Sequence, residues 1–217
     1  MTLELPIHEW GSADSDAPGI LLLQEIFGVS DYIKQRAADL HALGYYVLAP
    51  EIYWRLDGTE LDESAPDLLE RAMGIVGRLD WDQAVADAVA VLDRLRGRGQ
   101  GVGVLGFCFG GGLGYNVAAV SPPDVLVSYY GSALPRLLDL KPQVPSLHHF
   151  GNDDAFLDVD AIVPALGSDD RVDVYRYDGA GHAFDNPLPM FHNAAASALA
   201  WRRTEDFLAR RLPTTQG

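Results

Sequence analysis

Short apolar runs alternate with segments of helical periodicity along almost the whole chain. A run such as GILLLQE (residues 19–25) is typical of a strand that is covered on both faces, whereas apolar residues three and four positions apart indicate a helix. Strands are expected at residues 19–25, 45–50, 102–107, 125–130, 146–150 and 171–177. Helices are expected at residues 30–43, 81–95, 111–120 and 193–210, with a further helix from Leu68.

This alternation constrains the fold strongly. A strand, a helix and a second strand in this order form a crossover, and a series of crossovers builds a mostly parallel sheet with helices on both faces. With 217 residues, 48% of them hydrophobic, the chain is expected to form one α/β domain over residues 1–217. In the helix at 81–95, Val85, Val89 and Leu92 share one face, which we expect to be buried.

The charge and the single cysteine restrict the partners and the location of the chain. The formal net charge is −15, and a negative field repels nucleic acid and anionic lipid. One cysteine excludes an internal disulfide and is typical of a reducing compartment. The first residues lack the pattern of a secretory signal, and no apolar run approaches the roughly 20 residues that span a bilayer. We therefore expect a cytoplasmic protein with no nucleic-acid or membrane partner.

The cysteine lies among many glycines, in GVLGFCFGGG at residues 103–112. The overlapping segment GVGVLG (101–106) matches a dinucleotide-binding pattern, but its glycines fall within the expected strand, so no cofactor is expected there. Gly106, Cys108 and Gly110 form the pattern G-x-C-x-G between a strand and a helix, which is the cysteine version of a nucleophile elbow. The alternative is a buried structural cysteine, which the strand-turn-helix context disfavours.

A nucleophile elbow needs a histidine base and an acid, and these follow it in the order nucleophile, acid, histidine. His182 lies in a turn directly after the expected strand at 171–177, where a catalytic loop would emerge. Its alternative is an ordinary surface histidine. The acid should follow the preceding strand, where Asp153 and Asp154 are adjacent. The spacing does not distinguish between these two aspartates.

Five motifs resemble those of the dienelactone hydrolases, a branch of the α/β-hydrolases that uses a cysteine nucleophile. They are QEIFG (24–28), GFCFGG (106–111), YYG (129–131), GNDD (151–154) and GHAF (181–184), and they extend over nearly the whole chain. The resemblance implies an α/β-hydrolase fold and a catalytic triad of Cys108, Asp154 and His182. It implies no metal and no organic cofactor.

The resemblance also assigns roles around the triad. Glu25 would be an additional carboxylate that contacts the resting thiol and helps to form the thiolate. A buried carboxylate at the end of a strand is costly unless it has a function, which supports this role over that of an ion-paired loop residue. The backbone N–H groups of Ile26 and Phe109 would form the oxyanion hole. The candidate substrate contacts are Arg71, Arg55, Tyr130 and Phe184.

The chain departs from the family directly after the triad histidine. Well-known dienelactone hydrolases have a serine there and an arginine a few residues further on, whereas this chain has Ala183 and then the pair Asp185 and Asn186. The change removes one clamp for a substrate carboxylate and adds an acid beside it. We therefore expect a preference for neutral esters or lactones, unless Arg71 or Arg55 is a sufficient clamp.

These features favour a hydrolase of small ester or lactone substrates that uses a Cys-His-Asp triad. The alternatives are a non-catalytic α/β-hydrolase-like ligand-binding protein and a thiol redox sensor. A binding protein has no need of Glu25, Cys108, Asp154 and His182 together, and a redox sensor usually needs a second cysteine. The expected partner is a small-molecule substrate, and the expected assembly is a monomer or a small homo-oligomer.

Overall fold

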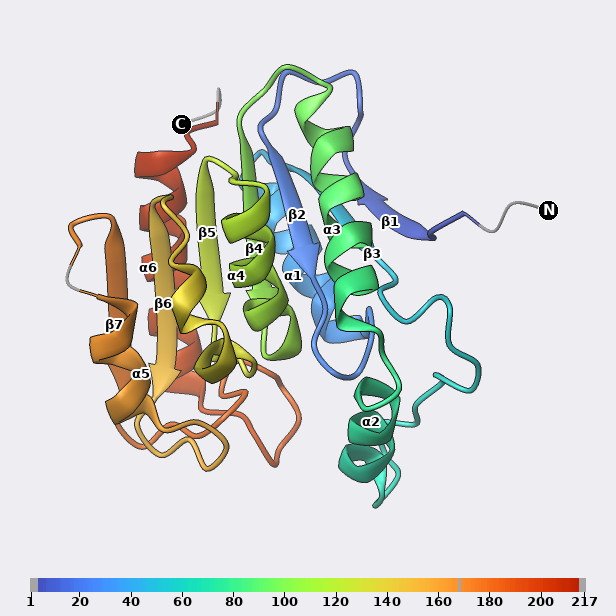
Figure 1. Ribbon diagram of the computed structural model, residues 1–217, viewed down its shortest axis with the longest axis vertical. Helices are drawn as coiled ribbons and strands as arrows, with labels where there is room; N and C mark the ends of the chain where they lie inside the picture. Colours follow the sequence, from blue (N-terminus) through green and yellow to red (C-terminus); the bar gives the residue numbers. More distant parts are fainter. Residues whose placement is uncertain (1–3, 168, 215–217) are drawn as a thin grey trace.

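A computed structural model describes residues 4–167 and 169–214 (Figure 1). Its centre is a seven-stranded sheet in the order β1-β3-β2-β4-β5-β6-β7. β1 pairs antiparallel with β3, and the other neighbouring strands are parallel. The strands are β1 (Ile7–Trp10), β2 (Gly19–Leu23), β3 (Tyr46–Pro50), β4 (Val102–Phe107), β5 (Val125–Tyr129), β6 (Ser146–Gly151) and β7 (Val172–Tyr177).

Helices cover both faces of the sheet, which confirms the expected α/β fold. Figure 1 shows α1 and α6 behind the sheet and α3, α4 and α5 in front of it. β2, β4 and β5 are buried along their whole length, which is why their sequences are continuously apolar. The helices are α1 (Asp31–Ala42), α2 (Leu68–Val76), α3 (Trp81–Arg96), α4 (Phe109–Val120), α5 (Val159–Leu166) and α6 (Ala194–Arg211), and two short 3-10 helices, η1 (Leu134–Arg136) and η2 (Leu138–Leu140), follow β5.

Besides the two 3-10 helices, the strand β1 and the helix α5 were not expected from the sequence. β1 (IHEW) has no continuous apolar run, because it is an antiparallel edge strand whose residues are only partly covered. α5 contains Pro164, which usually interrupts a helix, and it begins where the Asp158 side chain accepts a hydrogen bond from the Ala161 N–H. Both have weak sequence signals because neither has the regular pattern of a central strand or a long amphipathic helix.

The buried face of α3 also differs from the expected one. Val85 and Val89 are only partly buried, whereas Leu92 is fully buried. The face against the sheet is formed by Ala84, Ala88, Val91, Leu92 and Leu95. Small alanine side chains allow the helix to pack closely on the strands, and the periodicity of the larger residues alone does not reveal that face.

The parallel strands bring their carboxyl ends to one edge of the sheet, the lower edge in Figure 1. The segments that follow β2, β4, β6 and β7 therefore meet there, and they contain the candidate catalytic residues. None of the helices within residues 4–167 and 169–214 has both the length and the apolar character needed to cross a membrane.

Candidate active site

Cys108 lies in a sharp turn between β4 and α4. Its φ of 51° is in the left-handed region that residues other than glycine rarely adopt. The backbone is crowded on both sides of it: a Cβ on Gly106 would lie 2.1 Å from the Gly110 carbonyl oxygen, and a Cβ on Gly110 would lie 2.4 Å from that of Leu23. Only glycine fits at these two positions, and this explains the spacing of the G-x-C-x-G motif.

His182 connects Cys108 with Asp154. Its Nε2 atom lies 3.0 Å from the Cys108 sulfur, and its Nδ1 atom lies 2.7 Å from Oδ2 of Asp154. The two loops that carry the histidine and the aspartate follow neighbouring parallel strands, β7 and β6. A Cβ on Gly151 would lie 2.2 Å from the Ala180 carbonyl oxygen, so glycine allows the histidine loop to pack directly on the end of β6.

The two adjacent aspartates have different surroundings. The Asp154 side chain is fully buried, and its Oδ1 atom accepts hydrogen bonds from the N–H groups of Phe156 and Leu157 at 2.8 and 3.1 Å. Asp153 is exposed, and its side chain has no hydrogen bond to any part of the chain that the structure describes. Asp154 is therefore the aspartate in contact with His182, as the resemblance implies.

The charge of His182 depends on both of its neighbours. Burial alone would lower the pKa of His182, but the Cys108 sulfur and the Asp154 carboxylate outweigh it and raise the pKa to about 10. This value favours the imidazolium at neutral pH. The positive imidazole lies 3.0 Å from the Cys108 sulfur, where it can stabilise negative charge on that atom.

Glu25 follows β2 and is 1% exposed. Its carboxylate accepts a hydrogen bond of 2.6 Å from the Asn186 amide and a longer one of 3.4 Å from the Tyr130 hydroxyl. Burial is the main cause that raises the pKa of Glu25 to about 7, and the bond from Asn186 opposes it. The hydrogen-bond partner of the thiol is His182 rather than Glu25, which differs from the contact that the resemblance implies.

We expect Glu25→Gln to raise the free energy of unfolding more at about pH 8 than at about pH 5. Between the usual pKa of 4.5 and the raised value of about 7, the folded protein keeps this proton while the unfolded chain loses it. The stability that Glu25 contributes is therefore complete below pH 4.5 and is lost as the pH rises to about 7. A shift of this size corresponds to at most about 3 kcal/mol.

Denaturant unfolding at the two pH values measures this difference. Glu70→Gln, at an exposed position on α2, is the matched control and should change the free energy of unfolding equally at both pH values. If Glu25→Gln also changes the free energy of unfolding equally at both pH values, this would contradict the raised pKa of Glu25.

Asp185 is part of a buried ion pair. Its carboxylate accepts hydrogen bonds from Arg36 at 2.6 and 2.8 Å, and also from the hydroxyl groups of Tyr32 and Ser197. The expectation that Asp185 adds an acid beside the substrate is therefore wrong, because this side chain is fully buried against α1 and α6. The partner residues lie about 150 positions away in the sequence from Asp185 or on the last helix, and no motif marks them.

The backbone N–H groups of Ile26 and Phe109, the candidates for an oxyanion hole, have no hydrogen-bond acceptor in the part of the chain that the structure describes. Phe109 is the first residue of α4, and the first N–H groups of a helix have no acceptor within it. The Ile26 N–H has no hydrogen-bond acceptor within residues 4–167 and 169–214. Both residues line the same cavity as Cys108 and His182.

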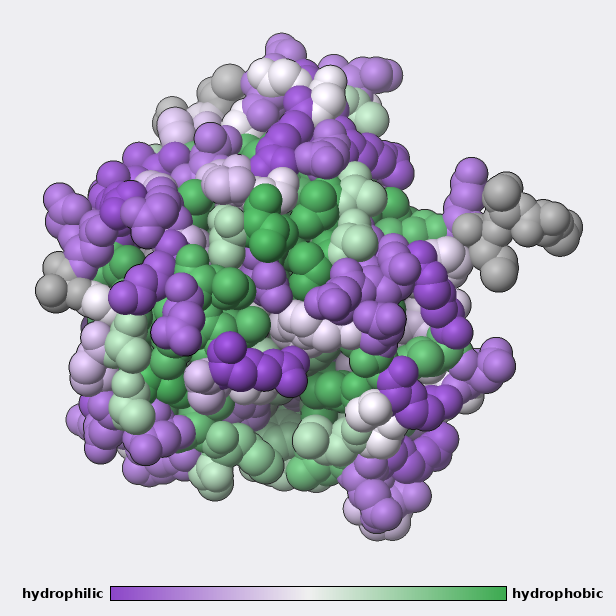
Figure 2. Space-filling model, in the orientation of Figure 1, coloured by the Kyte–Doolittle hydropathy of each residue, from purple (hydrophilic) through white to green (hydrophobic). Residues whose placement is uncertain are grey.

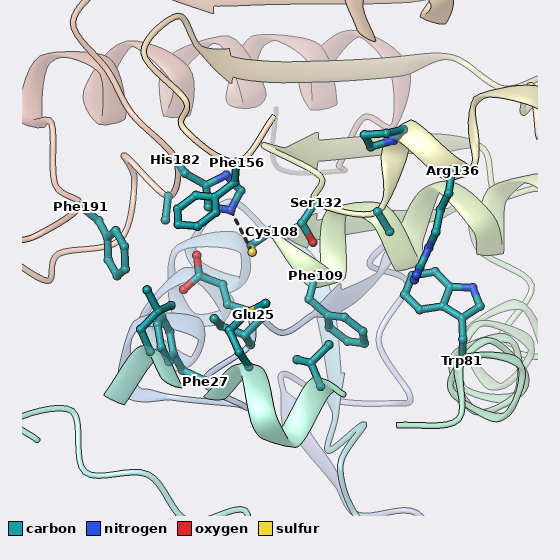
Figure 3. A pocket seen from close by; sticks show the side chains of 17 residues that line it. Glu25, Phe27, Trp81, Cys108, Phe109, Ser132, Arg136, Phe156, His182 and Phe191 are labelled. Atoms are coloured by element: carbon teal, nitrogen blue, oxygen red, sulfur yellow. Dashed lines mark hydrogen bonds between the residues drawn. The ribbon is translucent and has the colours of Figure 1, made fainter. Parts of the chain in front are cut away.

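That cavity has a volume of about 380 Å³ and opens at the carboxyl edge of the sheet (Figure 3). In Figure 2, hydrophobic residues gather near the lower edge of the molecule, with hydrophilic residues around them. Most of the lining is apolar and consists of Ile26, Phe27, Leu69, Met73, Val76, Trp81, Phe109, Ala133, Pro135, Phe156, Ala183 and Phe191. The polar lining residues are Glu25, Cys108, Ser132, Arg136 and His182. Such a cavity suits a small apolar molecule that meets a few polar groups.

The described residues offer no metal site of the usual composition. Among residues 4–167 and 169–214, no three His, Cys, Asp or Glu side chains are grouped so that they could hold a metal ion.

Two of the expected substrate contacts lie behind the cavity wall. Tyr130 and Phe184 are both fully buried, and neither is among the residues that line the cavity. The centroid of the Tyr130 ring lies 5.3 Å from those of His182 and Phe184. The Tyr130 ring therefore packs against His182 from the side of the core, and Phe184 packs against Tyr130 in turn.

The two expected arginines also lie outside the cavity lining. Arg55 forms a salt bridge with Asp87, and Arg71 donates a hydrogen bond of 3.1 Å to the Glu60 carbonyl oxygen. The arginine that does line the cavity is Arg136, at the end of η1. It belongs to no motif of the sequence, so only the structure identifies it.

The comparisons with protein families, with known sequences and with known structures identify relatives of one kind. The model of the dienelactone hydrolase family matches residues 9–212. A carboxymethylenebutenolidase from Pseudomonas putida is 34% identical over 206 residues, which cover 91% of this chain and 87% of that protein. A carboxymethylenebutenolidase from Pseudomonas sp. (strain P51) is 32% identical, with coverage of 97% and 90%. The crystal structure of a dienelactone hydrolase-like promiscuous phosphotriesterase from metagenomic libraries shares the fold, with a TM-score of 0.73, 24% identity and coverage of 95% and 98%.

Proposed function

We propose that Cys108, His182 and Asp154 are the catalytic triad of this protein. The chain belongs to the dienelactone hydrolase family and is a hydrolase of lactones or esters. The observation that carries the proposal is the continuous series of contacts from the Cys108 sulfur to Nε2 of His182 and from Nδ1 to Asp154, at 3.0 and 2.7 Å. These distances are within the range of hydrogen bonds between a nucleophile, its base and the acid.

In the proposed reaction the Cys108 thiolate attacks the carbonyl carbon of the substrate. The carbonyl oxygen becomes an oxyanion, which the N–H groups of Ile26 and Phe109 stabilise. The bond to the leaving oxygen then breaks, and the protonated His182 donates its Nε2 proton to that oxygen. Water then attacks the thioester and gives its proton to His182, and the thiolate leaves as the acid product is released.

Glu25 is proposed to act on this machinery through its charge. It lines the cavity beside Cys108 and His182, and its raised pKa of about 7 means that it ionises close to neutral pH (Figure 3). An ionised Glu25 stabilises the imidazolium of His182, because opposite charges attract at short range in a buried site. Glu25→Gln is therefore expected to alter the pH profile of kcat near neutral pH.

The experiment that tests the proposed function traps the thioester. The protein is mixed with 4-nitrophenyl butyrate, quenched in acid and analysed by intact mass spectrometry and peptide mapping. The expected result is one butyryl group per chain, attached to Cys108, with an initial burst of nitrophenolate in the same amount. An acyl group on another residue, or hydrolysis without any adduct or burst in the presence of a free Cys108, would contradict the proposed nucleophile.

A further inference from the structure

Arg136 is a positive group in an otherwise largely apolar cavity. Among the described lining residues it carries the one permanent positive charge. Its guanidinium forms no hydrogen bond or salt bridge with the chain within residues 4–167 and 169–214, although acidic residues outnumber basic ones by 31 to 16. A guanidinium donates up to five hydrogen bonds and pairs well with carboxylates. Arg136 therefore has its full capacity available for a ligand.

Arg136 is exposed at the mouth of the cavity, and its guanidinium is oriented by a contact that does not use its donors. It lies over the Trp81 ring, 4.5 Å from the ring centroid. The Trp81 ring is itself held by a hydrogen bond of 2.8 Å from its Nε1 to Asn116 and by an edge contact with Phe109. The stacked pair is visible at one end of the cavity in Figure 3. Stacking orients the guanidinium plane and leaves its N–H groups free.

Figure 3 shows His182 on one side of Cys108 and Arg136 on the other, beyond Phe109. In the proposed reaction His182 gives its proton to the leaving oxygen, so the leaving group lies on the side of His182. The acyl group of the substrate then extends from the sulfur in the other direction, toward Arg136. Glu25 lies on the His182 side, where a second negative charge is disfavoured whenever Glu25 is ionised.

We infer that Arg136 recognises an anionic group, such as a carboxylate, at the far end of the acyl portion of the substrate, an inference that rests on the proposed function. The substrate class is then an ester whose acyl chain has an apolar middle and a negative end. This differs from the sequence-based expectation of a preference for neutral substrates. That expectation placed Asp185 beside the substrate and did not include Arg136, whereas Asp185 is paired with Arg36 and Arg136 lines the cavity.

The test compares 4-nitrophenyl hydrogen glutarate, which has an anionic acyl group, with its neutral methyl ester. The measured quantity is the ratio of kcat/KM for the anionic ester to that for the neutral one. We expect Arg136→Gln to lower this ratio roughly tenfold to a hundredfold, because a charged hydrogen-bond partner is lost. Arg78→Gln is the matched control, because this substitution removes the same charge. Arg78 is exposed near the end of α2 and lies outside the cavity lining. This variant should change the ratio by less than about twofold.

An unchanged ratio in Arg136→Gln, or an equal fall in Arg78→Gln, would overturn the inference. A third substrate, 4-carboxyphenyl butyrate, carries the charge on the leaving group. If Arg136→Gln lowers kcat/KM for this ester as much as for the anionic glutarate ester, the assignment of the anion to the acyl side would be overturned. If neither ester is hydrolysed, the proposed function fails. Calorimetric binding of monomethyl glutarate to the wild type and to Arg136→Gln still tests the anion site in that case: equal binding overturns it, and weaker binding by the variant supports it.

Discussion

Replacing Cys108 by alanine is expected to lower kcat for ester hydrolysis by roughly 10⁴- to 10⁶-fold. The sulfur is the atom that attacks the carbonyl in the proposed reaction, and it is the atom in contact with Nε2 of His182. The change removes one buried atom and keeps a Cβ in the strained turn, so the backbone proposed to form the oxyanion hole should stay in place. Steady-state hydrolysis of 4-nitrophenyl butyrate measures the loss.

The control for this variant is its folding. Thermal unfolding followed by circular dichroism should show a folded Cys108→Ala protein with a cooperative transition. Cys108→Ser offers a second comparison, because it keeps a hydroxyl nucleophile that is much less acidic than a thiol and should have activity between those of alanine and cysteine. A folded Cys108→Ala variant with more than about one hundredth of the wild-type kcat would show that another group is the nucleophile.

The central part of the fold was predictable because its physical requirements are local. β4 (Val102–Phe107) has the expected bounds, since a strand that is buried on both faces must be apolar throughout. The turn after it was recognisable for a similar reason: Gly106 and Gly110 stand where a Cβ would collide with backbone oxygens. Helix α4 begins two residues before the expected position, because Cys108 itself is its N-cap residue. A small error of this kind is typical of helix ends.

The surroundings of the site depend on contacts that no local pattern contains. Asn186 bonds Glu25 across 161 positions of the sequence, and Arg36 pairs with Asp185 across 149. The sequence showed Asp185 and Asn186 as a pair of polar neighbours, but not that one of them faces a buried ion pair and the other a buried carboxylate. Whether a side chain faces the cavity or the core is decided by the packing of distant helices, and for these residues only the structure gives the answer.

Asp154→Asn is expected to lower kcat by roughly 10⁴-fold, the loss that follows when a triad aspartate in a serine protease becomes asparagine. Oδ1 of Asp154 accepts hydrogen bonds from the N–H groups of Phe156 and Leu157, so in the variant the amide oxygen must take this position. The NH₂ group then faces Nδ1 of His182 and can only donate to it. Because a protonated Nδ1 would then face another donor, the imidazole is held neutral with its proton on Nε2, and it loses the positive charge that accompanies the Cys108 thiolate in the proposed reaction.

Asp153→Asn tests the same charge change one residue earlier in the chain. Asp153 is exposed, and its carboxylate makes no hydrogen bond within the described residues, so kcat should change by less than about twofold. Both variants keep the size of the side chain, and equal unfolding temperatures would confirm that the difference lies in catalysis. The reverse ranking would assign the triad acid to Asp153. Equal and small effects would mean that the acid contributes little, and that the cysteine and histidine act as a pair that needs no third group to hold the imidazole in its productive tautomer.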